Sequence, residues 1–181
     1  MKQRGFTLVE IMVVIAIIAI AAVVAIPNIV STQRRQEINN RTRELVSAIR
    51  FARGEAASGR VFEAAPVERQ IFEAGIRFNT ATQYEVFVDD DDVPGNEMVL
   101  RTVNLDSREA GFTGTGGGTS ATIRSITIGA TTQTPPAGLQ LRFQRSGTLT
   151  APVDVQIQLR DEQTLETRDI TVTYSGQSRI L

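Results

Sequence analysis

The hydrophobic residues near the start of the chain form one long run. Residues 6–26 are apolar except for Thr7 and Glu10. A helix of about 21 residues rises about 30 Å, which is the thickness of the hydrocarbon core of a bilayer. Basic residues precede the run, and the positive-inside rule assigns such a flank to the cytoplasm. The pattern therefore predicts a transmembrane helix over 6–28, with the rest of the chain outside the cytoplasm.

A second pattern, with helical spacing, follows the membrane run. Its apolar residues recur at steps of seven, four, three and four, and so share one helix face: Ile38, Leu45, Ile49, Ala52 and Ala56. Pro27 removes a backbone donor, so we expect a kink or local unwinding there. Gly59 is a stop signal. The sequence thus predicts one helix from about residue 6 to about residue 58, whose part 29–58 is amphipathic.

After Gly59 the spacing of apolar residues changes to two, which is typical of half-buried strands. The strands expected from this alternation are 70–79, 83–88, 98–105, 123–128, 139–143, 153–160 and 168–174. The last two flank a short polar turn and are expected to form a hairpin. The predicted fold class is α+β, with the long helix packed on an antiparallel β-sheet domain that spans 59–181.

The composition narrows the classes of function. The chain has no Cys and no His, so a cysteine nucleophile, the commonest general base and the commonest metal ligand are absent. No pair of carboxylates has a spacing that indicates acid–base catalysis. The formal net charge of −1 gives no overall attraction to nucleic acid or anionic lipid. We therefore predict a protein that is not an enzyme and needs no cofactor.

The residues around the start of the apolar run form a recognisable motif. The stretch GFTLVE at 5–10, followed by the unbroken apolar run and Pro27, resembles the class III leader of type IV pilins and pseudopilins. In that family a prepilin peptidase cuts after the glycine, and the new N-terminal residue is then methylated. The resemblance implies a cleaved leader over 1–5, cleavage between Gly5 and Phe6, and N-methylation of Phe6. Two other interpretations of the run explain less. An ordinary signal peptide has a shorter apolar run, and a plain signal anchor does not explain why Glu10 lies within the run.

Glu10 is the residue that the apolar run alone does not explain. A carboxylate near the membrane core is costly unless it is paired. Cleavage after Gly5 creates an α-amine on Phe6, four residues before Glu10 and on the same helix face. The cation can belong to the same chain or, as the family resemblance implies, to the next subunit of a filament. We therefore assign Glu10 and Pro27 to assembly.

The helix after the membrane run and the C-terminal tail resemble one particular family of pilin-like proteins. The stretch 45–61, with its Ala-Arg-x-Glu-Ala core, and the tail 176–180 resemble the GspH/FimT family of minor pseudopilins and minor pilins. The resemblance implies a minor pseudopilin of a type II secretion system, a structural subunit of a short periplasmic pseudopilus that supports protein secretion. A first alternative is a FimT-like minor type IV pilin in pilus assembly or DNA uptake. A second is a signal-anchored periplasmic β-rich binding domain.

The same resemblance implies a location and a set of partners. The precursor would lie in the bacterial inner membrane as a single-pass protein, with its N-terminus in the cytoplasm and its C-terminal domain in the periplasm. It would then enter a pseudopilus or pilus. The implied partners are other pseudopilins or pilins, the prepilin peptidase and methyltransferase, an inner-membrane assembly platform, and membrane lipid before assembly.

Two further groups of residues are candidate binding sites. The oxygen-rich run Asp89, Asp90, Asp91 and Asp92 contains the candidates for calcium ligands. It lacks the alternating spacing and central glycine of an EF-hand loop, so we expect a hydrated, exposed loop and no metal. Arg168 and Arg179 are the candidate DNA contacts. Gln177 stands where DNA-binding relatives have an arginine, so we do not expect nucleic acid among the partners.

Overall fold

The structure is a computed structural model of the 181-residue chain. It describes the backbone of residues 8–64, 67–90, 97–105, 121–134 and 137–181, and the side chains of these residues except 22–34 and 62–69. The chain divides into two compact units, Met1–Gln36 and Glu37–Leu181.

Helix α1 (Leu8–Ser58) is one uninterrupted α-helix of 51 residues. Its end at Ser58 confirms the stop predicted at Gly59, which has a φ of +54°. The helix is also uninterrupted at Pro27, so the local unwinding considered there does not occur. A proline removes a single hydrogen bond of the helix ladder, and the neighbouring bonds hold the helical backbone on either side. Among the residues whose side chains are described, no helix has a stretch long and apolar enough to span a membrane.

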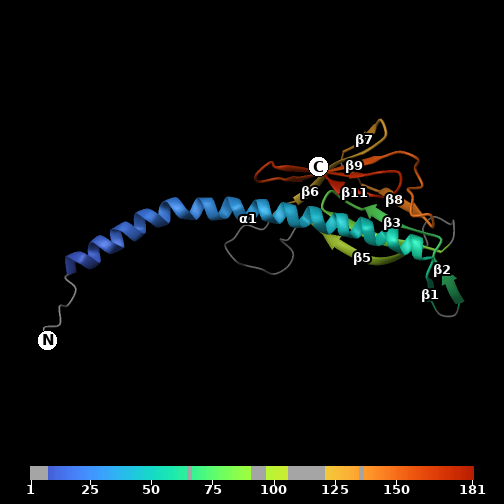
Figure 1. Cartoon of the computed structure of the whole chain (residues 1–181), viewed down its shortest axis with the longest axis horizontal. Helices are drawn as coiled ribbons and strands as arrows, with labels where there is room; N and C mark the ends of the chain where they lie inside the picture. The colour runs from blue at the N-terminus through green and yellow to red at the C-terminus, as the bar shows by residue number, and fades with distance from the viewer. Residues whose placement is uncertain (1–7, 65–66, 91–96, 106–120, 135–136) are drawn as a thin grey trace. The chain divides into compact units, whose positions relative to one another are not determined.

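The described residues of the second unit include the end of α1 and eleven antiparallel strands (Figure 1). The strands are β1 (Val61–Ala64), β2 (Val67–Gln70), β3 (Glu73–Phe78), β4 (Gln83–Asp89), β5 (Met98–Asn104), β6 (Ala121–Ile128), β7 (Thr131–Gln133), β8 (Leu139–Gln144), β9 (Val155–Asp161), β10 (Thr167–Val172) and β11 (Ser178–Ile180). They form a four-stranded sheet in the order β5-β4-β3-β8, a five-stranded sheet in the order β11-β10-β9-β6-β7, and the β1-β2 hairpin.

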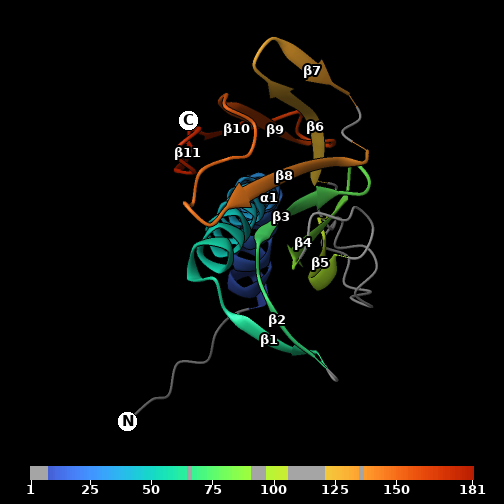
Figure 2. The same ribbon diagram turned by 90° about the vertical axis from the view of Figure 1, so that its right-hand side faces the viewer.

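The C-terminal part of α1 packs against both larger sheets, as Figure 2 shows nearly along the helix. All five residues of the predicted apolar stripe are fully buried: Ile38, Leu45, Ile49, Ala52 and Ala56. Except for Ile38, they join one core cluster with residues of both sheets, such as Phe78 of β3 and Ile157 of β9. The helix spacing of three and four therefore correctly predicted which face of α1 is buried.

The α+β class and the predicted β-hairpin are confirmed. Strands β9 and β10 pair from Val155↔Val172 to Arg160↔Thr167, and the inward residues Ile157 and Ile170 are fully buried. Two expectations differ from the structure. The strands form two sheets and a hairpin rather than one sheet, because alternation reports the buried face and not the partner strand. Tyr174, expected on the buried face, is 46% exposed, since the turn at 173–177 ends β10 before it.

Candidate functional site

The residues assigned to processing and assembly lie in the first unit. Gly5 and Phe6 lie outside the described residues. Glu10 is exposed in the first turn of α1, where the helix dipole favours a negative charge. The backbone of Pro27 is helical, and its side chain is not described. The processing and assembly roles of these four residues stay predictions.

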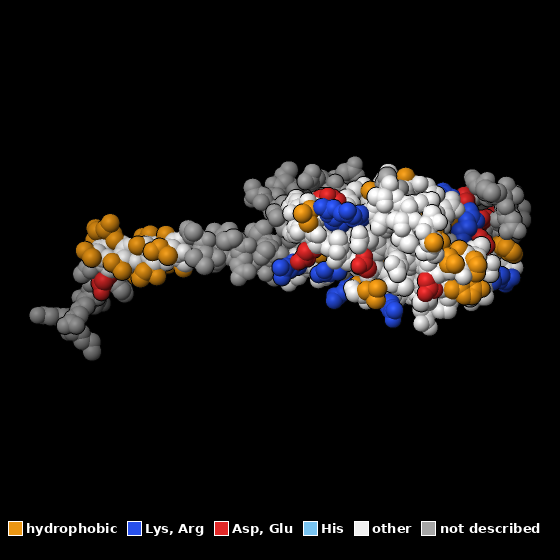
Figure 3. Space-filling model, turned by 90° about the horizontal axis from the view of Figure 1, so that it is seen from above, with side chains coloured by type: hydrophobic (Ala, Val, Ile, Leu, Met, Phe, Trp, Pro, Cys, Tyr) orange, Lys and Arg blue, Asp and Glu red, His pale blue; other side chains and the backbone are white. Residues whose placement is uncertain are grey.

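The described apolar side chains of this unit are exposed in the single chain. The large ones between Leu8 and Ile20 are 52% to 74% exposed, and Figure 3 shows apolar side chains gathered along this stretch. A contiguous apolar surface of this kind is not stable against water and marks contact with lipid or with other protein. The stretch is therefore chemically suited to lie in a membrane or in the core of an assembly.

The acidic segment after β4 behaves differently from the exposed loop expected for it. The side chains of Asp89 and Glu97, at its two ends, are only 1% and 3% exposed. Asp90 is half-buried, while Asp91 and Asp92 lie outside the described residues. The expectation of exposed, mutually repelling charges is thus wrong for Asp89, because Arg142 of β8 forms an ion pair with it. Among the described residues no cluster of Asp and Glu has the makings of a metal site.

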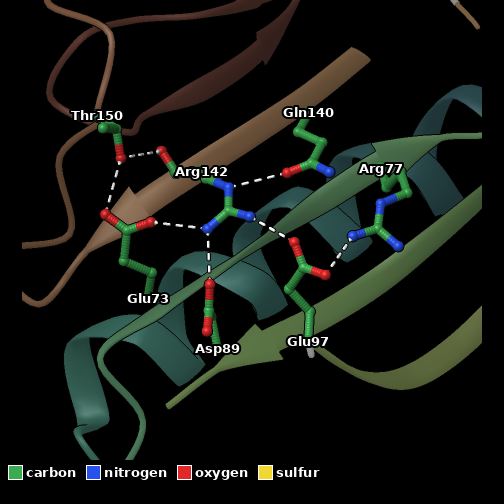
Figure 4. Close-up of polar contacts among 7 residues, drawn as sticks. All are labelled: Glu73, Arg77, Asp89, Glu97, Gln140, Arg142 and Thr150. Atoms are coloured by element: carbon green, nitrogen blue, oxygen red, sulfur yellow. Dashed lines mark hydrogen bonds and ion pairs between the residues drawn. The ribbon is translucent and has the colours of Figure 1, made fainter. Parts of the chain in front are cut away.

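Arg142 of β8 is the centre of this arrangement (Figure 4). Its Nη1 lies 2.7 Å from Asp89 Oδ2 and 3.2 Å from Glu73 Oε2, and its Nη2 lies 2.5 Å from Glu97 Oε1. Its Nε donates a hydrogen bond to Gln140 Oε1 at 2.8 Å. Hydrogen bonds to Asp89 and Glu73 raise the pKa of Arg142 although burial alone would lower it. We call this group the Arg142 cluster.

Arg77 of β3 extends the same cluster. Its Nη2 lies 2.8 Å from Glu97 Oε2, so Glu97 bridges two guanidinium groups. Burial would raise the pKa of Glu97, but the hydrogen bond from Arg77 and the charges of both arginines hold it below its usual value. The carboxylate is therefore ionised at neutral pH and ties the chain just before β5 to β3 and β8.

The ring of Phe87 lies beneath these charges. The guanidinium carbons of Arg77 and Arg142 each lie 5.2 Å from its ring centroid, within cation–π range. Gly75 makes room for the ring, since a Cβ there would lie 2.8 Å from Phe87 Cζ and 2.2 Å from the Leu141 carbonyl oxygen. The Arg142 cluster sets two guanidinium groups against three carboxylates, and its contacts hold β3, β4, β8 and the chain before β5 together.

A second contact joins the helix motif to the C-terminal tail. Arg53 Nε donates a hydrogen bond to the carbonyl of Gly147 at 2.9 Å. Arg50 Nη2 donates to the carbonyl of Ser178 at 3.1 Å. Gly176, with a φ of +78°, packs so closely on the same site that a Cβ would lie 2.2 Å from the Gly147 oxygen. The two stretches that resemble the GspH/FimT family are thus in direct contact, and we call this contact the tail clasp.

The two candidate DNA contacts do not form one patch. Arg168 lies on β10 and donates to Asn39 Oδ1 of the helix at 2.8 Å and to the Thr167 carbonyl at 2.9 Å. Arg179 is exposed on β11 opposite Thr171. Since Arg168 and Thr171 are three residues apart on one strand, Arg168 and Arg179 point to opposite faces of the sheet.

Comparison with known proteins agrees with the motif and the fold. Residues 1–26 match the family described as the prokaryotic N-terminal methylation motif. The crystal structure of the type IV minor pilin FimU of Pseudomonas aeruginosa is similar, with a TM-score of 0.52 and 17% sequence identity over 83% of this chain and 92% of that chain. No curated protein sequence matches the chain. Both the N-terminal motif and the fold are therefore similar to those of type IV pilins and pseudopilins.

Proposed function

We propose that the chain is a minor structural subunit of a type IV pilus or of a related secretion pseudopilus. The observation that carries the proposal is the methylation motif over 1–26 on a chain with the fold of a minor pilin. In this proposal the precursor is anchored in the inner membrane by residues 6–28, cleaved after Gly5 and methylated on Phe6. The helix then enters the filament core, and the β-sheet domain lies outside it.

The exposed apolar stretch of α1 supports this sequence of events. Lipid covers it in the precursor, and the apolar helices of neighbouring subunits cover it in the filament. Lipid tails are as apolar as the side chains of neighbouring helices, so the exchange of lipid for protein exposes no apolar surface to water and costs little. The same segment therefore serves first as an anchor and then as the assembly surface.

Processing is tested by changing Gly5 to Leu, whose side chain obstructs the approach of a peptidase. We expect the variant to stay in the inner membrane as a full-length precursor, while a Gly5→Ala control is processed at least in part. Mature protein of normal mass from Gly5→Leu would show that the leader assignment is wrong.

Glu10 is tested by its effect on assembly rather than on processing. Glu10→Gln keeps the shape of the side chain and removes its charge, whereas Glu10→Asp keeps the charge. We expect Glu10→Gln to be cleaved but to enter filaments at least tenfold less than the wild type, with Glu10→Asp in between. Equal incorporation of all three proteins would contradict an ionic role for Glu10 in assembly.

The choice between the two filament systems rests on different observations. The helix motif and tail resemble the GspH/FimT family and led to the prediction of a type II secretion pseudopilin. The fold likeness to FimU, a type IV minor pilin, favours a place in a pilus. Deleting the gene separates the two: loss of surface pili with normal secretion supports the pilus, and loss of secreted proteins with normal pili supports the pseudopilus.

A further inference from the structure

Strand β8 lies at an edge of the four-stranded sheet, and β3 pairs with one side of it only. On the other side, Arg142 O accepts a hydrogen bond from Thr150 N, and Gln144 N donates to Thr148 O, each at 2.9 Å. Alternate residues of an antiparallel strand direct their N–H and C=O groups to the same side. The backbone groups of Gln140 therefore face this side as well, and no backbone partner for them is found among the described residues.

A cleft of about 310 Å³ opens beside this free part of the β8 edge. The polar residues of its lining are Gln140, Arg142 and Thr150. The apolar ones are Ile128, Leu141, Leu149, Ala151 and Val155. An apolar cavity of about 150 Å³ holds a benzene molecule. The cleft therefore has room for one or two aliphatic side chains, and it is far too small for a helix or a folded domain.

The charges around the cleft define the chemistry of its occupant. Arg142 is the charged residue of the lining, and its guanidinium is already held by Glu73, Asp89 and Glu97. An acidic occupant would have to displace these carboxylates, and a basic one would find no acidic residue in the lining. The lining therefore favours an uncharged occupant that supplies both an aliphatic side chain and backbone hydrogen-bonding groups.

We propose that an extended, uncharged segment of a neighbouring filament subunit adds to the free edge of β8 at Gln140 and places an aliphatic side chain in the cleft. Backbone hydrogen bonds to Gln140 supply affinity in this mode, and the side-chain pocket fixes the register of the added strand. The inference rests on the proposed function, because the filament supplies the neighbouring subunit. It adds a contact between β domains to the assembly surface of the helix.

Two substitutions in the full-length chain test this contact. Gln140→Pro removes the N–H that faces the free edge and leaves the hydrogen bonds between β8 and β3 in place. It also removes the acceptor of Arg142 Nε, so Gln140→Ala, which loses the same acceptor and keeps the N–H, is its matched control. Ala151→Trp fills the cleft from an exposed position, and Ala151→Ser is the matched control that leaves the cleft open. The readout is the fraction of each variant recovered in sheared filaments relative to the membrane pool. Thermal unfolding verifies that each variant is folded.

We expect Gln140→Pro and Ala151→Trp to enter filaments about tenfold less than the wild type, the change that 1.4 kcal/mol produces, while Gln140→Ala and Ala151→Ser enter normally. Wild-type incorporation by both folded variants would overturn the strand addition and leave the proposed function intact. Absence of the wild-type chain itself from filaments would instead refute the proposed function, and the strand addition with it.

Discussion

Replacement of Arg142 by methionine removes the cation at the centre of the Arg142 cluster and keeps most of its apolar stem. Three carboxylates lose a partner, and the two most deeply buried are Asp89 at 1% and Glu97 at 3% side-chain exposure. Removing one partner of a buried ion pair costs about 3–5 kcal/mol. Arg142 is itself 23% exposed, and solvent screening reduces the expected loss in the free energy of unfolding to about 2–4 kcal/mol.

The loss should depend on pH in a definite direction. The lowered pKa of Glu97 gives the wild type stability that is fully present above the unfolded value of about 4.3 and is lost as the pH falls through the folded value. In Arg142→Met, Glu97 lacks one of its two arginines, so less of this pH-dependent stability is left to lose in acid. The difference between the two proteins should therefore be largest near neutral pH and shrink below about pH 4.

Urea unfolding of the full-length protein in detergent micelles, at several pH values, measures this difference. Arg124→Met is the matched control, since Arg124 is exposed on β6, and a change of less than about 0.5 kcal/mol is expected there. Asp89→Asn added to Arg142→Met should recover part of the loss. Equal stability of Arg142→Met and the wild type, or a loss that does not vary with pH, would refute the ionic account of the cluster.

Three further predictions concern packing. Tyr84 is fully buried and its hydroxyl has no hydrogen-bond partner among the described residues, so Tyr84→Phe should leave the free energy of unfolding unchanged or raise it by about 1 kcal/mol; a loss above 1 kcal/mol in urea would contradict this. Gly176→Ala should push its Cβ against the Gly147 oxygen and Arg53 of the tail clasp. The free energy of unfolding should fall by about 1–3 kcal/mol, which lowers the urea midpoint. An unchanged midpoint would count against the clasp. Ile49→Ala should cost about 2–5 kcal/mol by leaving a cavity under the helix, and a smaller loss would mean that α1 is not anchored by its stripe.

Much of the fold could be predicted because local spacing reports burial directly. The stripe from Ile38 to Ala56 lies on one helix face, and any partner that covers the helix must cover that face. The β9–β10 hairpin followed from two alternating runs around a short turn. Strands such as β7 and β11 were missed because they have only three residues each and no alternation to detect.

The sheet order and the Arg142 cluster could not be predicted, because both depend on contacts between distant residues. Strand β8 pairs with β3, far earlier in the chain, and places Arg142 beside Glu73 and Asp89. From the sequence, Arg142 is only a polar residue in an alternating strand, and Asp89 is one of four like charges. One local signal was available: Gly75 interrupts a strand, which is typical of a close approach by another group, here the ring of Phe87.

The mass of the N-terminal peptide of the protein purified from its host tests the central claim most directly. Cleavage after Gly5 followed by methylation predicts a chain that begins with N-methyl-Phe6, with the α-amine still cationic and placed to meet Glu10 of a neighbouring subunit. The same measurement in cells without prepilin peptidase should give the uncleaved precursor. A mature chain that begins at Met1, or one that begins beyond residue 26, would contradict the assignment of the helix to filament assembly.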